Sequence, residues 1–396
     1  MSPDDSRLTL KAVFAAVALL CAAGPAAAQT EGAQFEGLVR AAAKGVNQAL
    51  VTGNAEEALK GEPLAESIRP GMASQFSKAT AAQSAAARSN IRYTRATFDV
   101  KITDTKVEGD RATVKALVEN RRAMAGPTGT PPEARVTEAH VFEFTRQNGR
   151  WVLSKDQLVL PWQPPYGNPV DSAGAPQPLP ADAVPLDFGT PDPNRPKVNR
   201  GRGGTAGGGA AGAFSFASYS RSPVLETPKP AVYGTYSQSA ALAYKRQWVW
   251  GFNPDYRRYD GVGGDCTNFV SQVLRAGGWP DVSGYYTSDS AWWYNFANQS
   301  RSWAGAQNLY NFIRYSGRAS HASYLIDFIA GDIVQFRLGD YMPDAIHHSA
   351  VVDAVDGNGT VWIAYHSGPA EYELLSTFLA KHPGSTTYGW MIFDSF

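Results

Sequence analysis

The sequence predicts an α+β protein with two folded units, and three observations lead to this prediction. Apolar residues recur at helical spacing near the N-terminus, and a period of two replaces that spacing from Ile91 onward, as in helices followed by an antiparallel sheet. A segment rich in proline and glycine then separates this part from a C-terminal part that holds eight of the ten tryptophans. The 396 residues leave room for two ordinary domains.

Residues 1–28 have the pattern of a signal peptide. Arg7 and Lys11 precede an apolar run over 12–23, and the small residues 26–28 offer a cleavage site. The run is shorter than the roughly 20 apolar residues that a membrane span needs. We therefore expect a secreted or periplasmic protein that keeps no stable membrane anchor after cleavage.

The charges of the chain balance, with 36 basic and 36 acidic residues. This balance argues against a polycationic surface that would bind nucleic acid or an anionic membrane. We therefore expect no nucleic-acid partner.

The first unit is expected over residues 31–162. Residues 55–88 have a helical composition, and two hairpins follow, turning at 108–110 and at Asn148-Gly149, a pair that favours the positive φ angles of a two-residue turn. Helices followed by an antiparallel sheet are similar to the cone-shaped nuclear-transport-factor-like and cystatin-like folds. His140 lies in one of the strands without an obvious partner, so the sequence assigns no chemistry to this unit.

Residues 163–231 are expected to form a linker. Proline keeps its first part extended and glycine makes its second part flexible, and neither part has the apolar content of a core. The linker tethers the first unit to a second unit over 232–396, which opens with a predicted helix over 237–250.

The stretch GGDCTNFVSQVLRAGG places a cysteine at the start of a helix. Cys21 would be lost with the signal peptide, so Cys266 is the one thiol expected in the mature chain. Asp265 has the residue type of an N-cap, so Cys266 falls in the first turn, where unpaired N–H groups favour a thiolate. Because the Asp265 carboxylate opposes that thiolate, a catalytic cysteine needs a histidine beside it.

Two strands, over about 347–356 and 360–367, offer that histidine. If residue 356 pairs with residue 360, His348 and His366 share a face, and His348 removes the thiol proton while His366 orients its ring. A slip of one residue would put His347 on that face instead. We otherwise expect His347 at the rim and His321 and His382 at the surface.

A metal site formed by His347, His348 and His366 is the alternative role for these histidines. No HExxH-type spacing supports it, so we expect neither a metal nor another cofactor.

The same residues carry a resemblance to a known family. From about Tyr233 onward, the stretch that includes DCTNFVSQ, followed by GDIVQF, HHSAVVDA and AYHS, resembles the putative amidase domain family of bacteria, which is related to the NlpC/P60 and CHAP groups of papain-like hydrolases. The resemblance implies a papain-like unit with a nucleophile helix packed on an antiparallel sheet. It implies Cys266 as nucleophile and His348 as base.

Further features follow from the related groups. The third polar residue of the NlpC/P60 group is often histidine, which His366 matches, and a tyrosine upstream of the cysteine lies near the oxyanion site. Tyr256 and Tyr259 are both candidates for that tyrosine. The scissile bond in those relatives is commonly an amide in peptidoglycan.

We therefore expect an exported cysteine amidohydrolase that cleaves an amide bond in peptidoglycan or a peptide-like substrate through an acyl-enzyme. One alternative is a wall- or carbohydrate-binding module without catalysis, in which tryptophans stack on sugars, although aromatic residues at this density more often pack in a core. The tryptophans concerned are Trp279, Trp292, Trp293 and Trp303. A thiol acyltransferase with the same site is the other alternative.

Overall fold

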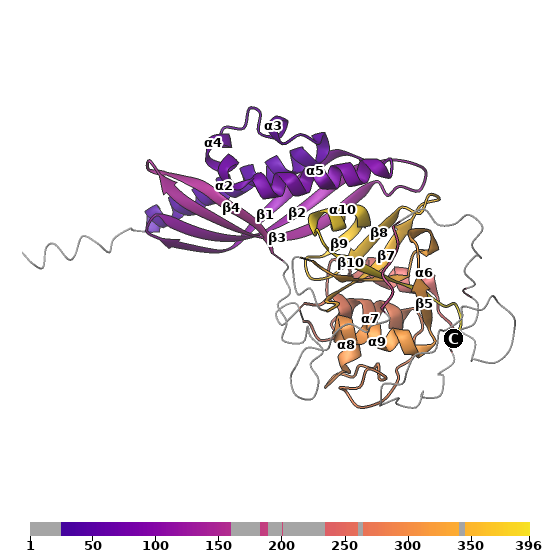
Figure 1. Cartoon of the computed structure of the whole chain (residues 1–396). Helices are drawn as coiled ribbons and strands as arrows, with labels where there is room; N and C mark the ends of the chain where they lie inside the picture. The colour runs from indigo at the N-terminus through magenta and orange to yellow at the C-terminus, as the bar shows by residue number, and fades with distance from the viewer. Residues whose placement is uncertain (1–24, 160–182, 189–199, 201–233, 260–263, 340–344) are drawn as a thin grey trace, which may run out of the picture.

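The computed structural model describes residues 25–159, 183–188, 200, 234–259, 264–339 and 345–396 (Figure 1). The apolar run of the predicted signal peptide and most of the predicted linker lie outside these residues. Within the described part, none of the helices has both the length and the apolar character needed to cross a membrane.

The N-terminal unit consists of helices packed on one face of a long antiparallel sheet, as predicted. Phe35, Phe144 and Trp151 form part of the core between these two layers. The helices are α2 (Pro25–Thr52), α3 (Ala55–Ala58), α4 (Ala65–Ile68), the 3-10 turn η1 (Arg69–Gly71) and α5 (Ala73–Arg88). The strands are β1 (Arg92–Glu108), β2 (Arg111–Ala125), β3 (Glu133–Gln147) and β4 (Arg150–Val159).

Both predicted hairpin turns of this unit are confirmed. Glu108 pairs with Arg111 across a two-residue turn in which Gly109 has a φ of 61°. Asn148 and Gly149 have φ angles of 49° and 77°, and Gln147 pairs with Arg150 around them. Positive φ at the first central position of one turn and at both central positions of the other matches the twist of the flanking strands, so these turns fix the register of the sheet.

The C-terminal unit has helices on both faces of an antiparallel sheet. One face packs on α7, α8 and α9, and the other packs on α10 (Figure 1). The helices are α6 (Gln238–Trp248), α7 (Cys266–Ala276), α8 (Arg301–Ala304), α9 (Ala306–Ser316), the 3-10 turn η2 (Leu325–Asp327) and α10 (Leu375–Lys381). The strands are β5 (Ala319–Ala322), β6 (Ile333–Arg337), β7 (His348–Val355), β8 (Val361–Tyr365), β9 (Ala370–Leu374) and β10 (Thr386–Ile392).

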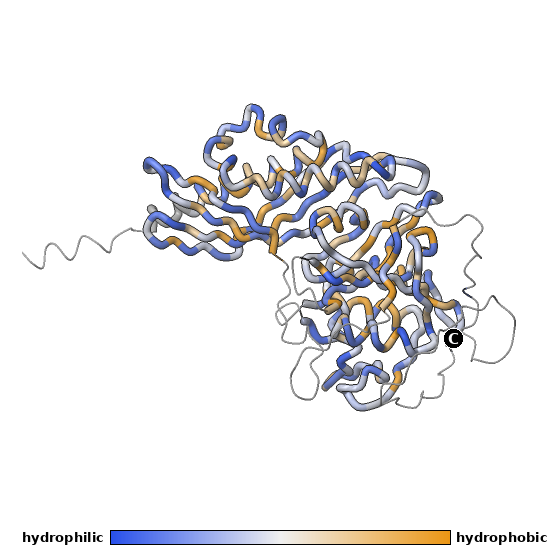
Figure 2. Tube along the Cα trace, in the orientation of Figure 1, coloured by the Kyte–Doolittle hydropathy of each residue, from blue (hydrophilic) through white to orange (hydrophobic). Residues whose placement is uncertain are grey.

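The two units share one sheet, which the sequence did not predict. The strand order is β1-β2-β3-β9-β8-β7-β6-β10-β5, with β4 paired to β3, and the junction is the pairing of Arg135 and Val136 with Glu371 and Ala370. Figure 2 shows hydrophobic residues along the strands on the C-terminal side of this junction. The N-terminal unit is therefore hydrogen-bonded to the C-terminal unit as well as connected to it by the chain.

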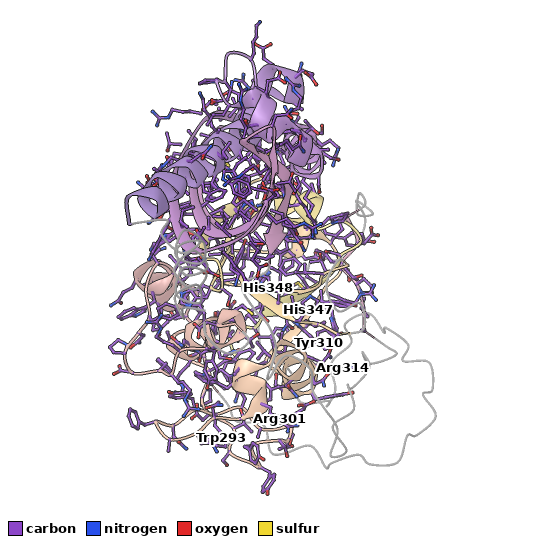
Figure 3. The ribbon with its side chains drawn as sticks, turned by 90° about the vertical axis from the view of Figure 1, so that its left-hand side faces the viewer. Trp293, Arg301, Tyr310, Arg314, His347 and His348 are labelled. Atoms are coloured by element: carbon purple, nitrogen blue, oxygen red, sulfur yellow. The ribbon has the colours of Figure 1, made fainter. Side chains whose placement is uncertain are left out.

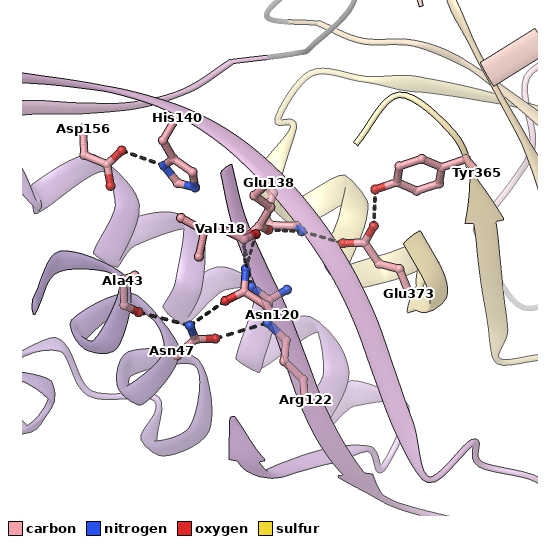
Figure 4. Close-up of polar contacts among 11 residues, drawn as sticks. Ala43, Asn47, Val118, Asn120, Arg122, Glu138, His140, Asp156, Tyr365 and Glu373 are labelled. Carbon is pink, nitrogen blue, oxygen red and sulfur yellow. Dashed lines mark hydrogen bonds and ion pairs between the residues drawn. The ribbon is translucent and has the colours of Figure 1, made fainter. Parts of the chain in front are cut away.

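A buried polar network lies beneath this junction (Figure 4). The Lys381 ammonium on α10 contacts the carboxylates of Glu138 on β3, at 2.7 Å, and Glu373 on β9. Glu138 also accepts hydrogen bonds from Arg122 and Asn120, at 3.0 and 2.7 Å. Burial opposes a charged Glu138, but Arg122 and Lys381 outweigh burial and lower the pKa of this carboxyl. The charges therefore stabilise one another across the junction.

Part of the predicted linker contacts the C-terminal unit. Leu186 is buried there, and its N–H donates to Thr387 O at 2.8 Å. Further along, the Arg200 guanidinium forms two 2.7 Å hydrogen bonds to both carboxylate oxygens of Asp332, which is fully buried at the start of β6. The C-terminal unit therefore includes residues upstream of the predicted boundary at 232.

We predict that Lys381→Met destabilises the protein by about 3–5 kcal/mol, because it leaves Glu138 and Glu373 buried without their shared cation. Chemical denaturation followed by circular dichroism measures this loss. Lys155→Met is the control, since Lys155 is exposed on β4, and it should change the free energy of unfolding by less than about 0.5 kcal/mol. Equal stability of the two variants would contradict the importance of the network.

We also predict that Arg200→Ala destabilises the C-terminal unit by about 3 kcal/mol or more, because Asp332 would keep a buried charge without its partner. Asp332→Asn and the double variant complete a mutant cycle, in which the double variant should lose less stability than the sum of the two single variants. Arg246→Ala, at an exposed position on α6, is the control. Additive losses would show that Arg200 does not pair with Asp332 in solution.

Candidate active site

Helix α7 places Cys266 in its first turn, as predicted. The helix packs through an apolar stripe, since Phe269, Val270, Val273 and Leu274 are all fully buried. Gly264, with a φ of 94°, turns the chain into the helix in a conformation that favours glycine. Cys266 is therefore fixed where the helix meets the sheet, and its side chain is buried.

The sulfur of Cys266 lies beside the backbone at the start of β7. Sγ is 3.9 Å from His347 O and 3.7 Å from Thr267 Oγ1. Burial raises the pKa of the thiol, while hydrogen bonds from the Ser349 N–H and from Thr267 favour the thiolate and only partly offset burial. The resting group is therefore a neutral thiol, and the expected thiolate is not the resting state in this structure.

A chain of polar side chains leads from the thiol into the core, and none of its members was predicted to have a role. Thr267 Oγ1 lies 3.0 Å from Ser349 Oγ, and Gln335 Nε2 donates to the same hydroxyl at 3.0 Å. Gln335 Oε1 in turn accepts from Trp390 Nε1 at 2.9 Å. These contacts fix the first turn of α7 against β6 and β7.

Asp265 occupies the predicted N-cap position, but its side chain does not cap the helix. One carboxylate oxygen accepts from the Tyr259 N–H at 3.0 Å and from Asn268 Nδ2 at 2.9 Å, and the other contacts His366 Nδ1 at 2.7 Å. The residue before the cysteine therefore holds a histidine, while its negative charge still raises the pKa of the Cys266 thiol.

The prediction that His348 and His366 share a face is wrong. The turn itself is as predicted, because the Asp356 N–H donates to Thr360 O at 3.1 Å. A bulge at Asp353 then shifts the register, so that Ala354 pairs with Trp362 but Val352 pairs with Ile363. Because a shift of one residue exchanges the faces, His348 is turned away from His366.

The extra residue of the bulge, Asp353, forms a buried ion pair. Asp353 directs its carboxylate to the ammonium of Lys245, at 2.6 Å, and accepts the Tyr372 N–H at 3.0 Å. Lys245 on α6 is fully buried and also contacts Glu371 at 2.9 Å. The prediction assumed that the residues of β7 alternate regularly between the two faces, and regular alternation does not include the extra residue that makes this contact.

His348 lies on the face of the sheet that packs on α10. Its ring is 4.7 Å from Tyr365 and 5.8 Å from Phe378, measured between centroids, and it also stacks on Phe336. Burial lowers the pKa of this imidazole well below its usual value, and His347 and His382 add to the effect. The predicted base is therefore a neutral ring on the opposite side of the sheet from α7.

His347 is the histidine that strand alternation places on the α7 face, together with Ser349. In Figure 3, His347 lies nearer Tyr310, and His348 lies nearer the N-terminal unit. Nδ1 lies 2.9 Å from Ala345 O, and Nε2 accepts from the Leu338 N–H at 3.3 Å. These partners assign the neutral ring with its proton on Nδ1. His347 is buried, so its prediction as a rim residue is wrong.

His366 lies on the α7 side and connects three elements. Beyond its contact with Asp265, Nε2 lies 2.9 Å from Trp248 O at the end of α6, and the ring stacks on Phe269 with centroids 4.0 Å apart. Both neighbouring groups are hydrogen-bond acceptors, so each bond is made when that ring nitrogen carries a proton. The structure brings His366 to Asp265 and not to His348.

The two candidate tyrosines have different surroundings. The Tyr259 backbone contacts Asp265 through its N–H and Gly264 through its carbonyl, which places it next to the cysteine turn. The Tyr256 ring stacks on Trp303 with centroids 5.7 Å apart and lies near Arg275 in the last turn of α7. Of the two, Tyr259 is the one attached to the start of α7.

The remaining predictions about side chains have mixed outcomes. Trp279, Trp292 and Trp303 are buried core residues, which confirms packing for these three. His382 is buried against Phe378, contrary to its expected surface position. His140 does have a partner, Asp156, with Nδ1 and the carboxylate 2.7 Å apart.

The described residues do not bring three histidine, cysteine or acidic side chains together in a group that could hold a metal ion. A cavity of about 300 Å³ lies where the two units meet, and it is lined by residues of both units, including Arg88, Asn358 and Ser376. Cys266 is not among its lining residues.

Comparison with known families identifies the C-terminal unit. Residues 235–390 match the putative amidase domain family. This putative amidase domain contains α7, β7 and β8, so Cys266, His347, His348 and His366 all lie within it. The match points to a hydrolase that acts on amide bonds.

Individual relatives add little to this assignment. The uncharacterized protein YhbB of Bacillus subtilis (strain 168) is 29% identical over 125 residues, which are 31% of this chain and 38% of that protein. The chain therefore matches less than half of the length of that relative. Two solved structures, the intermembrane space region of the chloroplast protein ARC6 and Kfla4162 from Kribbella flavida, align with TM-scores of 0.24 and 0.23. Their identities are 16% and 19%, and the alignments cover 32% and 33% of this chain and 93% and 91% of those chains.

We predict that Cys266 reacts with iodoacetamide with a midpoint at higher pH than a free cysteine, because burial raises its pKa and the thiolate forms only above the ordinary range. Peptide mass analysis at each pH separates this site from Cys21. An unstructured peptide with the sequence of residues 263–280 is the control. A midpoint below that of the peptide would contradict a neutral resting thiol and indicate a preformed ion pair.

Proposed function

We propose that the protein is an exported cysteine amidohydrolase whose C-terminal unit is papain-like and cleaves an amide bond in peptidoglycan or a related peptide. The observation that carries the proposal is the position of Cys266. Within the span that matches the putative amidase domain, this thiol lies in the first turn of α7, against the start of a strand that supplies histidines. Nucleophilic amide cleavage needs this pairing of a thiol with a nearby base.

Because the resting thiol is neutral, it has to lose its proton during the first step. Sγ attacks the carbonyl carbon of the amide while the thiol proton passes to a base, so a C–S bond forms as the C–N bond breaks. The base returns the proton to the departing amine. Water then attacks the thioester, which releases a carboxylic acid and restores the thiol. The base therefore has to act in the transition state, since the ion pair is not formed beforehand.

His347 is the base that the geometry favours. It directly precedes β7, strand alternation puts its side chain on the α7 face, and its carbonyl oxygen lies 3.9 Å from Sγ. Nε2 accepts a long hydrogen bond from the Leu338 N–H, with 3.3 Å between the two nitrogens. Release of that bond makes a neutral nitrogen available to accept the thiol proton, while Nδ1 keeps its hydrogen bond to Ala345 O.

Backbone N–H groups at the same place suit the charge that develops on the carbonyl oxygen. The first-turn N–H groups of α7 have no partners within the helix, and the Ser349 N–H already points to the sulfur. Donors fixed in the backbone stabilise an oxyanion without reorganisation. Asp265 and His366 hold these donors in place through the contacts described above.

Export and the wall substrate are the remaining parts of the proposal. Export is supported by the basic residues, apolar run and small residues of 1–28. A free thiol in an oxidising compartment is consistent with a catalytic role. A peptidoglycan amide is the substrate that fits an exported amidase, because the wall presents amide bonds in that compartment.

The test is digestion of purified peptidoglycan by the mature protein, with mass analysis of the products. Cys266→Ser should lower kcat/KM by about a thousandfold or more, and His347→Ala by about a hundredfold or more. His348→Phe is the matched control on the opposite face and should retain activity close to that of the parent. A free carboxylic acid in the product identifies hydrolysis, whereas transfer to a second amine identifies an acyltransferase.

Two results would contradict the proposal. Full activity of Cys266→Ser would exclude the thiol as nucleophile. Full activity of His347→Ala together with loss of activity in a correctly folded His348→Phe would assign the base to His348 and reject the face assignment made here.

A further inference from the structure

Residues 281–300, the main part of the loop between α7 and α8, carry aromatic side chains that point in two directions. Those that point inward anchor the loop to the nucleophile helix. Trp292 Nε1 donates to Ser271 Oγ at 3.1 Å, and Trp303, in α8 directly after the loop, donates to Asn268 Oδ1 at 2.7 Å. Because Ser271 and Asn268 belong to α7, the loop is fixed relative to Cys266.

The backbone of the loop is also held in place. Val282 and Trp292 exchange two backbone hydrogen bonds of 2.7 and 2.9 Å, and the Arg301 N–H donates to Tyr286 O at 2.7 Å. In the turn over residues 295–298, Asn295 Oδ1 accepts hydrogen bonds from the N–H groups of Ala297 and Asn298, at 3.0 and 2.8 Å. The turns are therefore ordered by their own hydrogen bonds.

The outward side chains are large and exposed. The exposed fractions are 74% for Tyr285, 44% for Tyr286 and 89% for Phe296. Trp293 is half-buried, with its indole N–H donating to Gly284 O at 3.0 Å. Figure 3 shows Trp293 and Arg301 at the end of the C-terminal unit farthest from the N-terminal unit. We call these four aromatic residues, Tyr285, Tyr286, Trp293 and Phe296, the aromatic platform.

Tyr285 and Tyr286 lie side by side, with ring centroids 5.5 Å apart, and adjoining exposed aromatic rings are typical of interaction sites. Rings on a fixed backbone lose little conformational entropy when a ligand stacks on them, so the platform is preorganised for binding. The core does not need these rings, since the inward tryptophans already anchor the loop.

The polar residues of the loop indicate the chemistry of the ligand. The same loop also carries hydroxyl and amide side chains, from Thr287, Ser288, Ser290, Asn295, Asn298 and Gln299. The two acidic groups are used internally, because Asp281 pairs with Arg275 and Asp289 accepts from Asn308 and Asn311. The sequence of the loop contains no lysine. A neutral ligand with an apolar face and many hydroxyl groups matches this combination.

We propose that the aromatic platform binds a neutral oligosaccharide. A pyranose ring presents a face of C–H groups that stacks on an aromatic ring, and its edge of hydroxyl groups bonds to amides and hydroxyls. An anionic membrane, the other surface that attracts exposed aromatic residues, is recognised through clusters of lysine and arginine, which the loop lacks. The platform therefore holds the saccharide part of a substrate or wall while α7 presents the thiol.

The binding is separate from the cleavage proposed above and is tested without it. The protein is the chain with Cys266→Ser, and the probe is the tetrasaccharide of β-1,4-linked N-acetylglucosamine, titrated by isothermal calorimetry. We expect saturable binding that weakens by about tenfold or more in Tyr285→Ala/Phe296→Ala. Both positions are exposed, so the fold should be retained. Tyr315→Ala, an equally exposed tyrosine on α9, is the matched control and should bind like the parent.

Two outcomes would contradict the proposal that the aromatic platform binds a neutral oligosaccharide. One is the absence of saturable binding, or equal affinity in the double variant and the parent. The other is platform-dependent binding to phosphatidylcholine–phosphatidylglycerol vesicles without binding of the tetrasaccharide, which would identify a membrane-binding surface. Failure of the catalytic proposal would leave both titrations unaffected, because neither uses the thiol.

Discussion

The carboxylate of Asp265 holds the centre of the C-terminal unit together. It binds the Tyr259 N–H and Asn268 side chain through one oxygen and His366 through the other, while the Asp265 N–H donates to Ser367 Oγ. His366 passes the connection to the end of α6 through Trp248 O. One buried side chain thus joins α6, α7 and the end of β8. Together with the Thr267–Ser349 contact, it sets the position of the first turn of α7, and so of the thiol, relative to the sheet.

The short motifs of the C-terminal unit meet around the same turn. Thr267 follows the cysteine in DCTNFVSQ, Gln335 lies in GDIVQF and Ser349 lies in HHSAVVDA, and these three side chains form one hydrogen-bonded chain. Asp332, the aspartate of GDIVQF, binds Arg200 from the upstream segment. Each motif therefore supplies a group that positions α7 or the sheet beneath it. This explains why residues far apart in sequence carry one recognisable pattern, since a change in any of them leaves a buried polar group unsatisfied.

Local patterns in the sequence were sufficient to predict the helices, strands and turns. They were not sufficient to predict how the strands pair. Asn148-Gly149 and the first turn of α7 were predictable because turn glycines and apolar spacing act within a few residues. The face on which His348 lies was not predictable, because it depends on the bulge at Asp353. This residue forms an ion pair with Lys245, which is distant in the sequence. Sequence alternation has a period of two and cannot show where a distant ion pair inserts one extra residue. The shared sheet was missed for the same reason, since β3 and β9 pair across a sequence separation that no local pattern records.

The shared sheet also gives the N-terminal unit a physical role. The first residues of β3 cover the edge of β9. This edge would otherwise present unpaired N–H and C=O groups to a second chain. Two acidic residues hold β9 in place. Glu371 binds Lys245 and the Trp250 indole, and Glu373 binds the Tyr365 hydroxyl and Lys381, which also contacts Glu138 on β3. Tyr365 ends β8, and His366 follows it directly. The contact between the two units is thus connected through β9 and β8 to the residue that holds Asp265, so the N-terminal unit supports the strands on which the site is built.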